Sequence, residues 1–235
     1  MVGACLPLSA SVNVRPCPFL SADPRVVEPS LTRPSQPPGD WMHAARGDNV
    51  QRMPATRVTW RDVLTMPEDG NRYEAIGGEL VVSPPPKVRH QWVTERLLGT
   101  LRDLLVRTGY GYLFPAPVGV VFPGTEEGVQ PDIVFVTRER LDIVGEDAIQ
   151  GPPDLVIEIL SPSTARRDRT VKRHLYERQG VAEYWIVDID ARQVEVWSFA
   201  AGTRDAERYT DRVPVRLGER VMGQVELATI FDWPR

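Results

Sequence analysis

Apolar side chains follow a helical spacing in one long segment of the chain and gather into short runs in several others. From 88 to 108 they recur at steps of three and four residues, which predicts an amphipathic helix. The runs "YLFPAPVGVVF", "DIVFV" and "PDLVIEIL" predict three strands. "EYWIVDI" and "QVEVWSF" predict two more strands, paired around Asp190 and Ala191.

Turn and helix-breaking residues divide the rest of the pattern. "VTWRDVLTMPEDG" predicts a short helix capped by Thr59 and ended before Pro67, whose ring and missing amide stop helices. "RYEAIGGELVVSPPP" predicts a hairpin that turns at Gly77 and Gly78. The Arg-rich segment 163–179 predicts a helix, and "VPVRLGERVMGQVELATIF" predicts short edge strands. This order predicts an α/β fold in which a mixed central β-sheet is flanked by helices.

The first part of the chain differs in composition from the remainder. Eight of the 22 prolines fall within residues 1–50, without any sustained periodicity around them. Such a segment buries too little apolar surface to offset the entropy lost on ordering it. We therefore expect a disordered Pro-rich tail at 1–55 and one folded domain at 56–235.

Charge and cysteine usage limit the class of protein. The formal charge of −4 at pH 7 provides no global basic field, so any contact with nucleic acid must be local. Cys5 and Cys17 are the only cysteines, which favours a reducing compartment. The sequence shows neither a secretory signal pattern nor an apolar run near the ~18 residues of a membrane span. We expect a cytoplasmic protein without a membrane partner.

Glu158 is the most informative residue, because it interrupts the continuous apolar run "LVIEIL". Such runs mark strands that are covered on both faces. An ionised carboxylate in that environment costs several kcal/mol unless it is paired, hydrogen-bonded or bound to a metal. Something in the fold must therefore compensate its charge.

Two further carboxylates border apolar runs. Asp132 follows Pro131 and precedes "IVFV", and Glu79 lies in the hairpin as "GGELVV". If the three strands are neighbours, these side chains converge with Glu158 at one rim of the sheet. Carboxylate oxygens of this kind form the hard-cation sites that Mg²⁺ or Mn²⁺ prefers.

These motifs and their order resemble one family. "PD" at 131–132 followed by "EIL" at 158–160 is similar to the PD-(D/E)XK nuclease pattern without its final Lys. "YEAIGGELVVSPPPKVRHQ", "VQPDIVFV" and "PPDLVIEILSPSTARRDRTVKRHLYERQGVAEYWIVD" are similar to the Uma2 family of restriction-endonuclease-like proteins. The similarity spans about residues 59–197. It implies that 56–235 is a restriction-endonuclease-like domain.

The resemblance also implies roles for individual residues. Asp132 and Glu158 would be metal ligands, with the backbone carbonyl of Ile159 beside them, and Glu79 would assist from the hairpin. Lys172, on the following helix, would replace the missing final Lys, because its long side chain can reach the same space. The catalytic residues expected from the resemblance are therefore two strand carboxylates, a hairpin carboxylate and a helix lysine.

The implied activity is that of an Mg²⁺- or Mn²⁺-dependent endonuclease acting on nucleic acid, with DNA as the expected substrate. The ions would neutralise the scissile phosphate and activate water, while the ammonium of Lys172 orients the nucleophile. A local basic patch would bind adjacent phosphates, and its members are Arg166, Arg167, Arg169 and Arg173. A homodimer would supply the two active centres that cutting both strands usually takes.

Each of these residues also has a purely structural explanation. A buried Arg or backbone amides could satisfy Glu158, and Glu79 could be a solvated turn residue. Lys172 could pair with Asp168, four residues earlier on the helix. The Arg cluster could be a solvated helix face. A lone His such as His90, at the start of the long helix, is more often a capping or packing residue than an acid or base.

Two other functions stay open at this point. The missing Lys after Glu158 favours a catalytically inactive module of the same fold that binds nucleic acid or a protein partner. A metal site could also hydrolyse a phosphate ester other than nucleic acid.

Overall fold

The computed structural model describes residues 57–233. The tail expected at 1–55 lies outside the described residues. The helices are α1 (Trp60–Val63), α2 (Val88–Leu101), the π-helical η1 (Arg102–Val106), the 3-10 helix η2 (Arg138–Ile143), α3 (Ala165–Arg167), the π-helical η3 (Asp168–Lys172), α4 (Arg173–Gln179), the 3-10 helix η4 (Phe199–Ala201) and α5 (Leu227–Phe231).

Thirteen strands accompany these helices in the described part of the chain. They are β1 (Arg72–Ile76), β2 (Glu79–Ser83), β3 (Gly111–Pro115), β4 (Gly119–Phe122), β5 (Glu127–Val129), β6 (Ile133–Thr137), β7 (Ala148–Gln150), β8 (Leu155–Ile159), β9 (Glu183–Asp188), β10 (Gln193–Ser198), β11 (Glu207–Tyr209), β12 (Arg212–Leu217) and β13 (Arg220–Glu226).

The strands form three sheets, and the six-stranded one confirms the predicted α/β class with a mixed central sheet flanked by helices. A six-stranded sheet has the order β11-β10-β9-β8-β6-β3, and a five-stranded sheet has the order β2-β1-β5-β4-β7. The edge strands expected near the C-terminus, β12 and β13, pair only with each other. The six-stranded sheet is mixed, because β8 runs parallel to β9 and antiparallel to β6.

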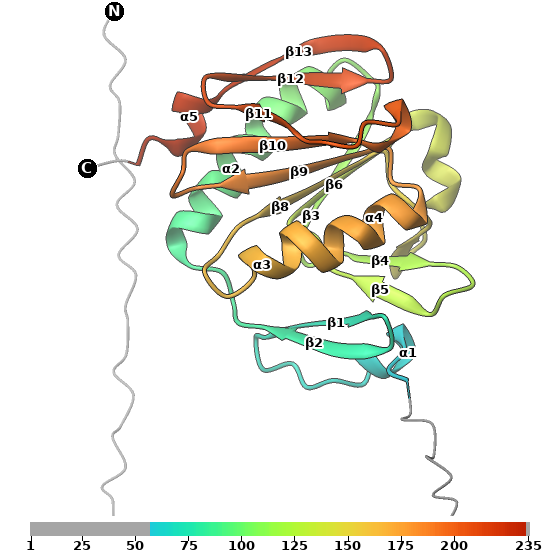
Figure 1. The fold of residues 1–235 in the computed structure, drawn as a ribbon. Coiled ribbons are helices and arrows are strands. Elements are labelled where there is room, and N and C mark those ends of the chain that lie inside the picture. The colour runs from blue at the N-terminus through green and yellow to red at the C-terminus, as the bar shows by residue number, and fades with distance from the viewer. Residues whose placement is uncertain (1–56, 234–235) are drawn as a thin grey trace, which may run out of the picture. The chain divides into compact units, whose positions relative to one another are not determined.

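The six-stranded sheet is covered on both faces. Figure 1 shows α2 on the far side of this sheet and α3 and α4 on the near side. Alternate residues of each strand face opposite sides. Ile157 and Ile159 therefore pack with the apolar side of α2, whereas Val156 packs in a second core with Leu175 and Tyr176 of α4. The even-numbered positions of β8 face α4.

The predicted N-terminal elements are confirmed in detail. Thr59 caps α1, and Thr59 and Asp62 form a reciprocal capping box, which satisfies amide groups that would otherwise lack partners. The hairpin β1–β2 turns at Gly77 and Gly78, both of which have positive φ. Positive φ is the conformation that a two-residue hairpin turn requires and that glycine adopts without steric cost.

One expected strand is two strands in the structure. "YLFPAPVGVVF" is divided at the cis Ala116-Pro117 bond into β3 and β4. β3 is the edge of the six-stranded sheet, and β4 belongs to the five-stranded sheet. The chain between them therefore passes from one sheet to the other, which an apolar run alone does not reveal.

The two longest predicted helices each contain a π-helical turn. The helix predicted over 88–108 continues from α2 into η1, and the Arg-rich helix of 163–179 consists of α3, η3 and α4. Such turns are often found at functional sites. Among the described helices, none is both long enough and apolar enough to cross a membrane.

Candidate active site

Glu158 lies on the face of β8 that packs against α4. Its strand is buried at every position, and Glu158 itself is only 2% exposed. Because it shares the even-numbered face with Val156, its side chain is directed to the helix that follows β8 rather than to α2. The helix must therefore supply the groups that compensate the carboxylate.

Lys172 supplies the compensating charge. Its Nζ lies 2.8 Å from Oε1 of Glu158 and 2.8 Å from Oε1 of Glu74 on β1. All three side chains are buried. The prediction that Lys172 reaches the space beside Glu158 is confirmed as a geometric statement, and its ammonium bridges two glutamates from different sheets.

Tyr176 fixes the same oxygen of Glu158. Its hydroxyl donates to Oε1 at 2.7 Å, so Oε1 accepts hydrogen bonds from both Lys172 and Tyr176. Among the described residues none donates to Oε2 of Glu158, and Glu158 is one of the residues that line the cleft described below. One oxygen of this carboxylate therefore has a structural task, and the other is available for a ligand.

Asp132 forms the second part of the site, directly before β6. Its Oδ1 accepts from Nη1 of Arg72 at 2.9 Å, and its Oδ2 accepts from the backbone N–H of Ile159 at 2.8 Å. The Nε2 of His90 lies 3.1 Å from Oδ2 and 3.0 Å from the carbonyl oxygen of Ile159. Asp132 is thus held beside the end of β8, next to Glu158.

The two carboxylates have opposite pKa shifts. Burial is the main cause that raises the pKa of Glu158 to about 8. The positive charge of Lys172 lowers this pKa, and the negative charges of neighbouring carboxylates raise it. Burial would raise the pKa of Asp132 as well, but the hydrogen bond from His90 and the charge of Arg72 lower it to about 2. Asp132 is therefore ionised at neutral pH, whereas burial and its neighbours drive Glu158 toward the protonated form.

Lys172 stays protonated in this environment. Burial lowers the pKa of its ammonium, but the carboxylates of Glu158 and Glu74 outweigh burial and hold the pKa above its ordinary value. Burial also raises the pKa of Asp168, which lies on the same π-helical turn. The cluster contains more carboxylates than cations. This excess of negative charge favours the protonated forms of both Glu158 and Lys172. Lys172 can donate hydrogen bonds but cannot act as a base.

These side chains form the floor of a cleft with a volume of about 530 Å³. Asp132, Glu158, Asp168 and Lys172 lie in it together with His90. Its walls are formed by prolines, hydroxyl residues and basic residues: Pro84, Pro85, Pro86, Ser161, Ser163, Thr164, Arg72, Lys87 and Arg89. A negative floor with cationic walls can bind a metal ion together with an anionic group.

The structure corrects the prediction for the hairpin carboxylate, Glu79. Glu79 is exposed at the start of β2 beside the turn, and it does not line the cleft. Glu74 on β1 takes the place predicted for it, because its Oε1 contacts Lys172 and accepts from the backbone N–H of Gln130. The two residues share one face of the hairpin, but Glu74 pairs opposite Val81, away from the turn.

The four arginines predicted to bind phosphate do not line the cleft. Arg169 bonds to Asp188 and Glu195, and Arg173 bonds to Glu177 and lies over the ring of Trp197. Arg166 is exposed on α3, and Arg167 only approaches the hydroxyl of Ser83 at 3.4 Å. Their role in binding phosphate stays a prediction, and Arg167 is the one of the four whose side chain approaches a residue of the cleft, Ser83.

The basic residues at the cleft come from other elements. Arg72 begins β1, and Lys87 and Arg89 lie at the start of α2. Together with Glu74, these are functional candidates that sequence reasoning missed, and His90 is one for which it favoured a structural role. The sequence does contain a signal for Glu74. Like Glu158 in its own strand, it is a charged residue inside an apolar strand, between Tyr73 and Ala75.

The residues fit a divalent cation by their donor chemistry. Oε2 of Glu74 and Oδ1 of Asp168 are buried without a hydrogen-bond partner among the described residues. In the described part of the chain, four buried carboxylates face Lys172 and Arg72 as their only permanent cations, so positive charge is in deficit there. Across residues 57–233 no three Asp, Glu, His or Cys side chains form a ready-made cage. An ion would therefore use Asp132 and Glu158 with a backbone carbonyl.

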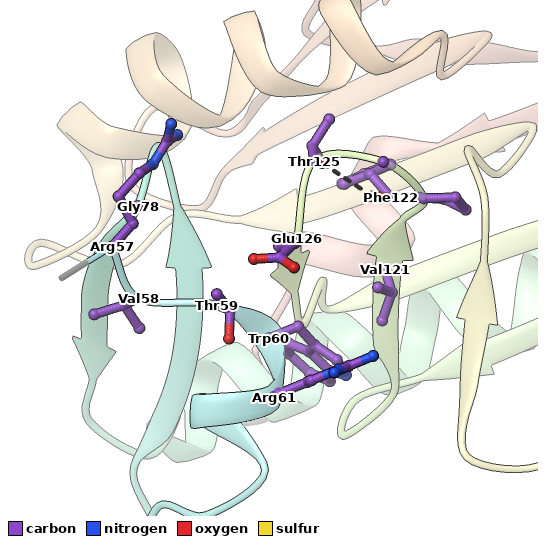
Figure 2. Close-up of a pocket in the computed structure, with 12 residues that line it drawn as sticks. Arg57, Val58, Thr59, Trp60, Arg61, Gly78, Val121, Phe122, Thr125 and Glu126 are labelled. Atoms are coloured by element: carbon purple, nitrogen blue, oxygen red, sulfur yellow. Dashed lines mark hydrogen bonds between the residues drawn. The ribbon is translucent and has the colours of Figure 1, made fainter.

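A second cavity lies apart from this cluster. It has a volume of about 610 Å³ and surrounds Trp60, with walls from the residues before α1 and from the β4–β5 turn (Figure 2). Trp60 packs over Gly119 and Gly128, where a Cβ atom would collide with its ring. None of the residues predicted for catalysis lines this cavity.

Comparisons with known proteins identify a family and a similar fold. The model of the Uma2 family, described as "Putative restriction endonuclease", matches residues 60–229. The solved structure of a putative nuclease of the DUF820 group from Anabaena variabilis is similar in fold, with a TM-score of 0.61 and 21% sequence identity. The match covers 74% of this chain and 97% of that one. A comparison with curated proteins finds no match.

Proposed function

The chain belongs to the Uma2 family of putative restriction endonucleases, and we propose that it is a metal-dependent endonuclease that hydrolyses phosphodiester bonds in DNA. The observation that carries this proposal is the excess of buried carboxylates around Lys172 on the floor of the cleft. A folded protein keeps such an excess at a cost of stability unless a cation binds there. Buried, strongly shifted groups in a cleft are typical of active sites.

In this proposal Asp132, Glu158 and the carbonyl of Ile159 hold Mg²⁺ or Mn²⁺. Carboxylate and carbonyl oxygens are the ligands that these hard ions take. Arg72 and the backbone N–H of Ile159 keep Asp132 ionised and correctly turned for this task. A bound ion would neutralise the scissile phosphate and make water more acidic.

Lys172 serves as a fixed hydrogen-bond donor. Its position between Glu74 and Glu158 allows the ammonium to orient a water molecule or a phosphate oxygen beside the carboxylates. Because its pKa is held high, it stays charged throughout the reaction. A preorganised charge of this kind stabilises the negative charge that develops in the transition state.

The basic wall of the cleft would bind the nucleic-acid backbone. Arg89 pairs with Asp190, but both side chains are largely exposed, with exposed fractions of 48% and 82%. Exposed pairs of this type contribute about 1 kcal/mol or less, so a phosphate can replace Asp190. Arg72 and Lys87 lie on the same cleft. Contacts to phosphate position the substrate but carry no sequence information.

The experiment is a cleavage assay with the full purified chain. Plasmid DNA is incubated with Mg²⁺ or Mn²⁺, and EDTA serves as the metal-free reference. We expect cleavage that requires the ion and is abolished by Glu158→Gln and by Asp132→Asn. Glu79→Gln is the matched control, because Glu79 is an exposed glutamate outside the cleft. Cleavage that persists in Glu158→Gln would contradict the proposal.

One observation favours a second function, a non-catalytic nucleic-acid-binding module. The position after Ile159, where the nuclease pattern has Lys, is occupied by Leu160, which packs in the core with α4. Calorimetry with Mg²⁺ separates the two functions. DNA binding without ion binding at Asp132 and Glu158 would favour the module.

A further inference from the structure

His90 occupies an unusual position for a lone histidine. It lies in the first turn of α2, and its ring reaches the end of β8 on the floor of the cleft. Its Nε2 lies 3.1 Å from Oδ2 of Asp132 and 3.0 Å from the carbonyl oxygen of Ile159. These two oxygens are the atoms that the proposed function assigns to the metal ion.

Nε2 of His90 is spaced from each of the two oxygens as neighbouring ligands of one ion are spaced. Two neighbouring ligands of a six-coordinate ion, with bonds of about 2.1 Å, lie about 3.0 Å apart. The distances from Nε2 to the two oxygens match this spacing. An ion that binds Asp132 and Ile159 would therefore lie within bonding reach of the imidazole.

The other ring nitrogen has a partner that suits this role. Without a metal, two acceptors face Nε2, so the proton is placed on Nε2. Binding a metal through Nε2 requires the other neutral tautomer, in which the proton moves to Nδ1. Oγ1 of Thr94 lies 3.5 Å from Nδ1, and because it donates to the carbonyl of His90, its lone pairs can accept. Metal-bound histidines usually have such a partner on the second nitrogen.

We infer that His90 is a further metal ligand beside Asp132 and the carbonyl of Ile159, and that the site consequently binds a divalent transition ion in preference to Mg²⁺. This inference rests on the proposed function, because it uses the same ion position. Imidazole nitrogen adds affinity for ions such as Ni²⁺, whereas Mg²⁺ depends on oxygen ligands. The nitrogen therefore shifts the selectivity of a site that is otherwise built from oxygen.

The test measures ion binding and does not depend on cleavage. The full chain is freed of metal with EDTA, and NiCl₂ and MgCl₂ are titrated separately by calorimetry into wild type and His90→Gln. Gln keeps an N–H donor for Asp132 and Ile159 but has no imidazole nitrogen. We expect Ni²⁺ affinity to fall about tenfold or more and Mg²⁺ affinity to fall by a smaller factor.

Two variants make the result specific. His174→Ala removes an exposed histidine of α4 that lies outside the cleft, and it should leave the Ni²⁺:Mg²⁺ selectivity unchanged. Thr94→Val keeps the imidazole but removes the partner of Nδ1, and it should lower Ni²⁺ affinity more than Mg²⁺ affinity. Thr94→Val also serves as the test if His90→Gln does not fold.

An equal fall for both ions in His90→Gln, or no fall, would overturn the inference, because His90 would then only position Asp132. If His90→Gln gives such a result while wild type cleaves DNA with Mg²⁺, the inference about His90 is wrong but the nuclease proposal stands. Failure of wild type to bind either ion would overturn both proposals.

Discussion

Nζ of Lys172 lies 2.8 Å from Oε1 of Glu158 and at the same distance from Oε1 of Glu74, although the three residues belong to a helical turn and to two different sheets. The ammonium thus joins the six-stranded sheet to the five-stranded sheet at the floor of the cleft. Removal of this single charge should affect both catalysis and folding.

Lys172→Met tests both effects. Without the ammonium, we expect kcat for cleavage to fall about 100-fold or more, because a preorganised charge is lost. The buried carboxylates also lose their partner, which should lower the free energy of unfolding by about 3 to 5 kcal/mol. Steady-state kinetics and urea denaturation measure the two quantities.

Lys87→Met is the control for the first effect, since it removes the other lysine of the chain. Lys87 lies on the cleft wall, so its loss should raise KM for DNA and leave kcat nearly unchanged. An equal loss of kcat in both variants would contradict the role assigned to Lys172.

Tyr176→Phe removes the second hydrogen bond to Oε1 of Glu158. We expect a loss of about 1 to 3 kcal/mol in the free energy of unfolding, since a buried acceptor loses one of its donors. A donated hydrogen bond favours the ionised carboxylate, so its loss should raise the pKa of Glu158 and move the acid limb of the pH–rate profile upward.

Tyr184→Phe is the matched control. Tyr184 is equally buried, but its hydroxyl donates to the backbone carbonyl of Asp168. It should cost about 1 kcal/mol and leave the pH–rate profile in place. Identical profiles for the two variants would argue against a role for Tyr176 in setting the state of Glu158.

Glu127→Gln tests pH-dependent stability away from the cleft. The backbone N–H of Gly77 and the guanidinium of Arg178 bind its carboxylate and, against burial, hold its pKa below the ordinary 4.5. A lowered pKa stabilises the fold above pH 4.5, and this contribution is lost as the pH falls through the folded-state pKa. We expect Gln to cost about 2 kcal/mol at pH 7 and clearly less near pH 4. Urea denaturation at both values measures this difference, and a pH-independent cost would contradict the explanation.

Gly128→Ala tests the contact of Trp60 with the five-stranded sheet. A Cβ at this position would overlap the indole ring, so we expect a loss of about 1 to 3 kcal/mol in the free energy of unfolding. Gly99→Ala is the opposite case, because Gly99 lies within α2 and a Cβ there meets nothing within 4 Å. That variant should be stabilised by about 0.5 to 1 kcal/mol. Thermal denaturation of the pair checks the sign of both effects.

The sequence predicts the elements and part of the cluster for clear physical reasons. Glu158 is recognisable because a charge inside a buried strand must be compensated. Glu74 carries the same signal in a shorter apolar strand, whereas Glu79 borders a longer apolar run, which makes its signal the stronger of the two. A strand's period of two identifies the face of a residue but not its distance from the turn.

His90 and the arginines show what local patterns cannot reveal. The partner of His90, Asp132, lies 42 positions further along the chain, and no spacing rule connects the two. Arg169 lies within the π-helical turn and Arg173 directly after it, so their orientation depends on a helical phase that the sequence pattern does not indicate. Long-range contacts and helical phase therefore had to come from the structure.

The π-helical turn also limits how this protein can tolerate changes in length. Each residue inserted into or deleted from a helix rotates everything beyond it by about 100°. Between Ser161 and Lys172 such a change would swing the ammonium away from Glu158, even with every side chain retained. The number of residues in this crossover therefore matters to the site as much as their identity does. Insertions or grafted loops should be tolerated better outside this segment.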